Sequence, residues 1–142
     1  MKNNYAKSGF TLIEIMIAVV LLGLAVASLV ASNIAFTKAN GAGCELSTAE
    51  FLIEQMREKT ALIAYANLNA LDNVTYSPSQ NARGENITEL SGYSQQIIVE
   101  NVSNSNFQTV VADGSSNFKR VTVTVSLNAK VINTGSWIRS NY

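Results

Sequence analysis

Residues 15–37 contain no charged side chain and are rich in Ala, Val, Leu and Ile. At ~1.5 Å of rise per residue, a helix over this run is ~35 Å long, which exceeds the ~30 Å hydrocarbon core of a bilayer. A spanning segment must be helical, because every backbone polar group needs a partner in lipid. A buried core helix is the alternative, although few soluble helices carry so long an uncharged stretch. The run therefore predicts a membrane-inserted helix.

The short stretch before the apolar run is polar and basic. Lys2 and Lys7 favour its retention on the cytoplasmic side. A secretory signal peptide has its small-residue cleavage site after the apolar region, whereas here the junction between Gly9 and Phe10 precedes that region. Cleavage at this junction leaves the apolar helix on the mature protein, which then begins with Phe10. The alternative is an uncleaved signal anchor in which Gly9 is only a loop residue.

Glu14 lies near the start of the apolar helix, and the next charged residue is Lys38. On insertion scales a carboxylate costs roughly 2.5–3.5 kcal/mol at the bilayer centre and less near the interface, so such a residue usually has a partner. After cleavage, the new α-amino group of Phe10 supplies a cation one helical turn away. The pairing can form within one chain or between subunits. A helical stack of identical subunits would repeat the second arrangement and neutralise each charge.

The motif at the start of this helix resembles that of type IV prepilins and of type II secretion pseudopilins: Gly9-Phe10-Thr11-Leu12-Ile13-Glu14. The resemblance covers about the first thirty residues. It implies that a prepilin peptidase/methyltransferase cuts after Gly9 and methylates the amino group of Phe10, and that Glu14 guides assembly. The partners it implies are this enzyme, other pilin-like subunits, an inner-membrane assembly platform and membrane lipid.

Composition disfavours several other functions. The chain has no histidine, so the usual catalytic triads and His-containing metal sites are absent. Removing Lys2 and Lys7 from the 10 basic residues leaves 8 against 10 acidic ones, without a basic patch suited to nucleic acid. We expect no enzymatic activity, no cofactor and no nucleic-acid partner. Asp113 and its neighbours are a thin ligand set for calcium, and a turn is the favoured interpretation. Cys44 is the one cysteine, which excludes an intrachain disulfide and leaves an intersubunit one open.

A second helical segment is predicted after the apolar run. Apolar residues recur at three- and four-residue spacing between Leu46 and Ile63, with most charged residues on the other faces. Two features predict a bend or local looseness near residues 40–47, namely the glycines of Asn40-Gly41-Ala42-Gly43 and the capping-box pattern Ser47-Thr48-Ala49-Glu50. The helical spine is predicted to end at about Leu68.

Residues 69–92 are rich in turn-forming residues and are predicted to be a connection. The segments predicted as strands are 95–102, 107–112, 118–127 and an edge segment at 131–138, broken at Asn133-Thr134-Gly135. Residues 118–127 alternate apolar and polar side chains, as in an antiparallel sheet with one solvated face. The amphipathic helix can cover the other face. The predicted fold class is α+β and pilin-like: a long N-terminal helical spine packed on a small antiparallel sheet.

The predicted organisation is a leader at 1–9, a transmembrane and assembly helix at 10–37, an amphipathic half of the spine at 38–68, and a loop-and-sheet head at 69–142. The favoured function is a minor structural subunit, held in the inner membrane with its head in the periplasm and then built into a pilus or pseudopilus. A membrane-anchored enzyme and a binding module that never polymerises are the alternatives. Neither needs an acid at the depth of Glu14. Contacts with neighbouring subunits are expected through residues 69–92 and near Trp137.

Overall fold

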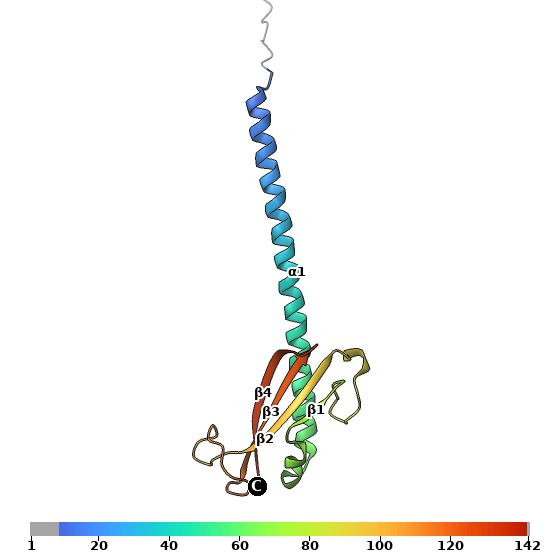
Figure 1. The fold of residues 1–142 in the computed structure, drawn as a ribbon, viewed down its shortest axis with the longest axis vertical. Helices are drawn as coiled ribbons and strands as arrows, with labels where there is room; N and C mark the ends of the chain where they lie inside the picture. Colours follow the sequence, from blue (N-terminus) through green and yellow to red (C-terminus); the bar gives the residue numbers. More distant parts are fainter. Residues whose placement is uncertain (1–8, 142) are drawn as a thin grey trace, which may run out of the picture. The chain divides into compact units, whose positions relative to one another are not determined.

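The computed structural model of the chain describes residues 9–141, so the predicted leader lies outside the described residues except for Gly9. Its elements, in chain order, are α1 (Leu12–Leu62), η1 (Tyr65–Leu71), β1 (Val74–Tyr76), η2 (Thr88–Leu90), β2 (Tyr93–Asn101), β3 (Phe118–Leu127) and β4 (Lys130–Ser140) (Figure 1). The long helix and the four-stranded antiparallel sheet confirm the predicted α+β, pilin-like fold class. The chain divides into two compact units between Ala42 and Gly43, and each is described by itself.

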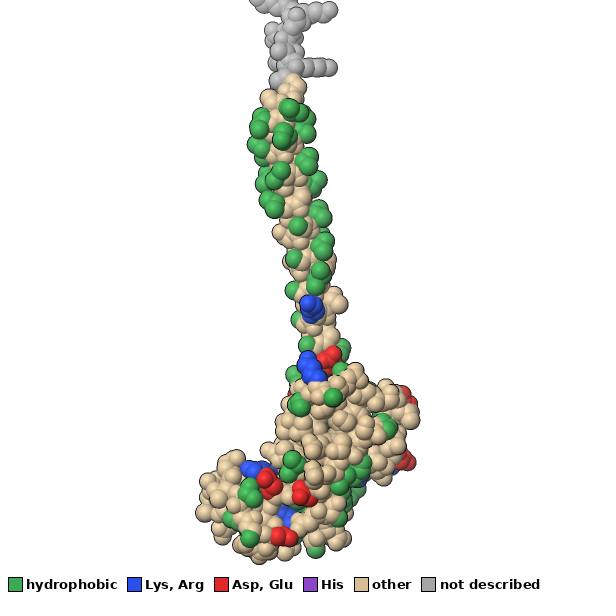
Figure 2. Space-filling model, viewed as in Figure 1, with side chains coloured by type: hydrophobic (Ala, Val, Ile, Leu, Met, Phe, Trp, Pro, Cys, Tyr) green, Lys and Arg blue, Asp and Glu red, His purple; other side chains and the backbone are tan. Residues whose placement is uncertain are grey.

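The first unit consists of α1 up to Ala42 and the residues before it. All of its described side chains are exposed, and Figure 2 shows apolar side chains covering the visible face of this segment. The hydroxyl groups of Ser28, Ser32 and Thr37 donate to carbonyls one turn earlier at 2.8–2.9 Å, which satisfies them within the helix. By length and composition α1 contains a stretch able to cross a membrane, and none of that stretch is buried within the chain.

The α-helix continues through the segment predicted to be loose. Gly41 and Gly43 are helical, and Ser47-Thr48-Ala49-Glu50 does not begin a new helix, because it lies inside the continuous helix α1. The Thr48 hydroxyl donates along this helix to the carbonyl of Cys44 at 2.9 Å. The helix ends at Leu62 rather than at about Leu68. Ala64 is extended, with ψ at 142°, and residues 65–71 form the separate 3-10 helix η1.

The C-terminal end of α1 is held by a side chain of β4. The guanidinium of Arg139 donates to the carbonyl of Thr60 and, at 3.3 Å, to that of Ile63. The last carbonyls of an α-helix lack the usual partner four residues further on. Here the Thr60 carbonyl accepts the backbone N–H of Ile63 at 3.3 Å, and Arg139 adds a charged donor to it and to the carbonyl just after the helix. Arg139 therefore stabilises the point at which the α-helix stops and ties it to the sheet.

The second unit begins at Gly43 and contains the sheet, whose strands follow the order β1-β2-β3-β4 with every neighbouring pair antiparallel. The bounds of β3 are those predicted, and β2 lies close to its predicted range. β1 lies inside the region predicted as a connection. A two-residue turn joins β3 to β4, and both of its residues, Asn128 (φ 49°) and Ala129 (φ 67°), are left-handed, as in a type I′ hairpin.

The strand predicted at residues 107–112 is wrong. The backbone N–H of Gln108 donates to the side-chain oxygen of Asn106 at 3.0 Å, and the N–H of Thr109 donates to the Asn106 carbonyl at 3.0 Å, so the chain turns here. The Phe107 ring instead lies 5.1 Å from that of Phe118. Residues 102–117 are therefore a long loop between β2 and β3, with only an isolated bridge between Val102 and Val110.

The core lies between one face of the sheet and the part of α1 that follows Gly43. Its buried apolar members come from α1, η1, β2 and β3: Ala49, Leu52, Ile53, Met56, Leu68, Ile97, Val99, Val121, Val123 and Val125. Trp137 packs against them from β4. Gly135 does not break the edge strand as predicted. A Cβ at this position would lie 2.7 Å from Cγ2 of Ile53, so the missing side chain lets the helix approach the strand.

Candidate functional site

The candidate site is the N-terminal end of α1, at residues 9–14. Gly9, Phe10 and Thr11 precede the first helical residue, Leu12. The side chain of Phe10 is 84% exposed, and a Cβ added to Gly9 would meet nothing within 4 Å. The junction that the sequence indicates for cleavage therefore lies in exposed, non-helical backbone. A peptidase can bind this backbone without first breaking helical hydrogen bonds.

Thr11 and Glu14 form a reciprocal capping box. The backbone N–H and the hydroxyl of Thr11 both donate to Oε2 of Glu14 at 3.2 Å, and the backbone N–H of Glu14 lies 3.3 Å from the Thr11 hydroxyl oxygen. Such a box satisfies N–H groups that the first helical turn leaves without partners. A carboxylate is also favourable at the positive end of the helix dipole. Glu14 thus stabilises the start of its own helix.

The sequence interpretation included Glu14 but missed Thr11. The signal was present, because Thr11-Leu12-Ile13-Glu14 has the form of a capping box just before an apolar run. The same pattern at residues 47–50 was interpreted as a local helix start, although it lies within α1. The pattern specifies a helix start only where the preceding residues are not helical.

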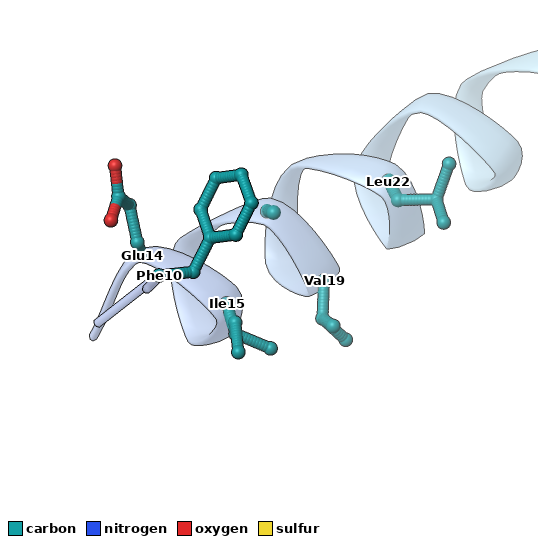
Figure 3. A pocket seen from close by; sticks show the side chains of 6 residues that line it. Phe10, Glu14, Ile15, Val19 and Leu22 are labelled. Carbon is teal, nitrogen blue, oxygen red and sulfur yellow. The ribbon is translucent and has the colours of Figure 1, made fainter. Parts of the chain in front are cut away.

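The capping box uses only one oxygen of the Glu14 carboxylate. Both side-chain contacts found for it among residues 9–141 involve Oε2, and none involves Oε1. An ionised carboxylate has about four lone-pair sites, so Oε1 retains the capacity to accept further hydrogen bonds. Glu14 lines a largely apolar hollow together with Phe10, Ile15, Val19 and Leu22, and Figure 3 shows its side chain extending away from those of Ile15 and Val19. The carboxylate is therefore compatible with both a capping role and a contact with another chain.

The turn at Asp113 forms a second polar cluster. The side-chain amides of Asn101 and Asn69 donate to the two oxygens of Asp113, and these bonds hold the pKa of that carboxyl below its ordinary value. The Lys119 ammonium, which is buried, donates to the carbonyl of Tyr65 at 3.1 Å. Burial raises the pKa of Tyr65, and the nearby charge of Asp113 raises it further. These contacts fasten the loop between β2 and β3 to η1.

No cluster of three or more His, Cys, Asp and Glu residues that could hold a metal ion lies within the described part of the chain. The two oxygens of Asp113 already accept hydrogen bonds from asparagine amides. The geometry at this turn is that of a loop fastened by amides to the strand β2 and to η1.

Comparison with known protein families gives a match to the N-terminal part of the chain. Residues 4–30 match the family model for the prokaryotic N-terminal methylation motif, a range that includes the junction at Gly9 and the capping box of Thr11 and Glu14. No curated protein and no solved structure matches the chain. Proteins with this motif are structural subunits that generally assemble with other pilins. The chain carries the signature of type IV prepilin-like and pseudopilin-like proteins.

Proposed function

We propose that the chain is a minor structural subunit of a type IV pilus or a type II secretion pseudopilus. It is cut between Gly9 and Phe10, methylated at Phe10 and assembled from the inner membrane, with its head in the periplasm. One observation carries the proposal. The only acidic side chain in the apolar part of α1, that of Glu14, lies on the first helical turn beside an exposed, non-helical junction.

The chemistry of assembly follows from this placement. Cleavage creates an α-amino group on Phe10, which is largely cationic below its usual pKa of about 8. A carboxylate in a water-poor filament core needs such a cation, because a buried charge without a partner is strongly destabilising. The apolar part of α1 is exposed over its whole length in the single chain, so it also requires lipid or neighbouring helices. A helical array of subunits supplies both the cation for Glu14 and the apolar surroundings for α1.

The head supports the proposal by presenting an ordered surface. Lys59 of α1 donates to the side-chain oxygen of Gln80 at 2.7 Å, and Gln55 accepts the backbone N–H of Ala82 at 3.0 Å. These contacts fasten the segment 77–92 to the helix. A surface that is already ordered loses less entropy on binding than a mobile loop. We therefore propose that contacts with neighbouring subunits involve residues 69–92.

Processing is tested by mass spectrometry of the mature protein. The expected product begins with Phe10 and carries an N-methyl group. A replacement of Gly9 by Leu is expected to leave uncut precursor in the membrane, because a bulky residue then occupies the junction. A mature chain that retains residues 1–9, or one cut behind the apolar run, contradicts the proposal.

A membrane-anchored module that never polymerises is the second candidate. The capping box favours it, because this box gives Glu14 a role that needs no neighbour. The wild-type chain separates the two candidates, and the variants Glu14→Gln and Glu14→Ala test whether assembly needs the charge, since glutamine also serves at this capping-box position but carries no charge. A filament subunit requires the charge, so both variants should be inserted and cleaved yet be depleted from sheared filaments on immunoblots. If the wild-type chain never enters the sheared fraction, the second candidate is correct.

A further inference from the structure

We infer that the free edge of β4 pairs with the free edge of β1 in a second copy of this chain, so that the sheets of neighbouring subunits continue into one another. This inference rests on the proposed function, because it names the backbone through which residues 69–92 of one subunit meet the next. β1 and β4 are the outer strands of the sheet, whose order is β1-β2-β3-β4 (Figure 1). Among residues 9–141, each of them therefore has one side without a strand partner.

The free side of β4 carries backbone groups that are spaced for a further strand. In an antiparallel pair, alternate residues direct their N–H and C=O groups towards the partner strand. The N–H of Asn141 donates to the carbonyl of Asn117 at 3.0 Å, so the odd-numbered residues that precede it on β4 bond to β3. The backbone groups of Ser136, Ile138 and Ser140 therefore face away from β3. The described part of the chain supplies no other hydrogen bond to them.

This stretch of β4 lacks the usual protection of an edge strand. Natural edge strands are often interrupted by proline, by bulges or by charged side chains. The one proline of the chain is Pro78, and the bulge in the pairing of β3 with β4 lies at Val125 and Ser126, near the start of β4. Arg139 is turned towards α1, where it donates to the carbonyl of Thr60. Residues 136–140 can therefore accept an extended strand.

The free side of β1 presents the backbone of Thr75. The N–H of Val102 donates to the carbonyl of Phe118 at 3.0 Å, so even-numbered residues of β2 bond to β3 and odd-numbered ones bond to β1. Val74 and Tyr76 lie opposite odd-numbered residues of β2 and use their backbone groups there. Thr75 lies between them, so its N–H and C=O face the free side, and its side chain is exposed.

The direction of the strands favours this occupant over a symmetric dimer. Every neighbouring pair in the sheet is antiparallel, so β4 runs opposite to β1. A second copy in the same orientation therefore brings its β1 antiparallel to β4. A twofold pairing of β4 with itself would instead reverse the part of α1 that packs on the sheet, whereas subunits inserted from the same side of one membrane share one direction. The contact between β4 and β1 is heterologous and repeats from copy to copy, as a filament requires.

The side chains at the two edges are also complementary. With Thr75 of one copy opposite Ile138 of the other, Tyr76 comes opposite Trp137 on the core side of the sheet. Both aromatic side chains are partly exposed in the single chain and pack at the margin of the core. Aromatic pairs directly opposite each other stabilise antiparallel strands, and this register brings no like charges together. The pairing is short, but packing of α1 in a filament supplies the high effective concentration that a weak contact needs.

The test is cysteine crosslinking between two differently tagged full-length copies expressed together, with Cys44 replaced by Ser in both. One copy carries Thr75→Cys and the other Ile138→Cys, because directly opposite residues of a strand pair have Cα atoms at a distance that a disulfide can bridge. The mixed disulfide dimer should appear in membranes and in sheared filaments. The matched control replaces Ile138→Cys by Thr122→Cys on the interior strand β3 and should give no mixed dimer. Absence of the mixed dimer, or a dimer formed only between two Ile138→Cys copies, overturns the inference.

Ser136→Pro separates strand pairing from mere proximity. Proline removes an N–H that the sheet of the single chain does not use, so an edge strand tolerates it, yet it blocks the approach of another strand. Added to the Ile138→Cys copy, Ser136→Pro should abolish the mixed dimer, whereas Ser136→Ala should retain it. Urea unfolding followed by Trp137 fluorescence verifies that the proline variant folds, and Ser140→Pro serves if it does not. A mixed dimer that survives in a folded proline variant overturns the inference.

The sheared fraction separates failure of this inference from failure of the proposed function. If the wild-type chain never enters sheared filaments, the proposed function fails, whereas a proline-sensitive mixed dimer in the membrane still supports the edge pairing. If the chain enters filaments and no mixed dimer forms, the proposed function stands and the pairing of β4 with β1 is wrong.

Discussion

Replacing Gly135 by Ala tests the packing of α1 on the sheet. The new Cβ would lie 2.7 Å from Cγ2 of Ile53, whereas carbon atoms pack best at about 3.5–4.0 Å, so one group must move by about 1 Å. Ile53 is buried and its β-branched side chain is stiff in a helix, so it cannot easily rotate away. Overpacking of this kind costs about 1–3 kcal/mol, and the lower entropy of the unfolded chain offsets about 0.4–1 kcal/mol. We expect a net loss of about 1–2 kcal/mol in the free energy of unfolding.

The assay is urea unfolding of the full chain in detergent, followed by the fluorescence of Trp137. This residue is the one tryptophan of the chain, lies in the same strand and packs against the core, so its emission reports on the head. Ser136→Ala is the matched control, because Ser136 is exposed and adjacent along the strand. The control should change the free energy of unfolding by less than about 0.5 kcal/mol.

Two substitutions at Ile53 identify the clashing group. Ile53→Ala removes Cγ2, so Gly135→Ala should cost nothing further in that background, although Ile53→Ala alone is destabilising by about 2–5 kcal/mol. Ile53→Val removes the terminal methyl but keeps one at the position of Cγ2, so the cost of Gly135→Ala should persist. The reasoning is refuted if Gly135→Ala is neutral in the wild-type chain, or if its cost is the same in the Ile53→Ala background.

Three further predictions concern the head. Ala129→Gly should raise the free energy of unfolding by about 1 kcal/mol in the same urea titration, because glycine adopts positive φ without the penalty that alanine incurs in this turn. A lower urea midpoint would contradict this prediction. Arg139→Ala should lower the free energy of unfolding by roughly 1.5–3 kcal/mol and speed amide hydrogen exchange near Thr60, because the carbonyls of Thr60 and Ile63 lose a charged donor. Arg139→Lys should be intermediate, and unchanged exchange would contradict the prediction. The amides of Asn101 and Asn69 hold the pKa of Asp113 below its ordinary value, so its contribution to stability is present above the ordinary pKa and is lost as pH falls through the lowered one. Asp113→Asn should remove this part of the loss of stability in acid, and identical curves of stability against pH for the variant and the wild type would refute the assignment.

The elements predicted best from sequence are those whose pattern reflects burial on one side. Residues 118–127 alternate because one face of β3 meets the core and the other meets solvent. The apolar run at 15–37 also gives a direct signal, since it is exposed among residues 9–141. Residues 107–112 have the composition of a strand but begin in a turn and form only an isolated bridge at Val110. The contacts of this turn with Asn106 and Phe118 lie outside that window. β1 is short and depends on pairing with β2, which a local pattern does not encode.

The other differences between the sequence predictions and the structure concern single residues, because the role of a residue depends on which residues it contacts. Gly135 was interpreted as a break in a strand, yet it is the position where Ile53 of a distant helix approaches the strand. Arg139 gave no local signal of its contact with the end of α1. Thr11, in contrast, was predictable, because its partner Glu14 lies only one turn away. Local partners can be inferred from spacing, whereas distant ones require the fold.

The backbone polar groups at the two ends of α1 find hydrogen-bond partners by different means, and the difference follows from the surroundings of each end. The C-terminal carbonyls are reached by Arg139 from β4, which is possible because that end packs within the head. The N-terminal end, if it lies in or near lipid as proposed, has no sheet to supply donors or acceptors and little water. It must be satisfied by its own residues, and the pair of Thr11 and Glu14 does this. The start of α1 is therefore stabilised by a local pair of side chains, whereas its end is stabilised by a side chain that lies far away in the sequence.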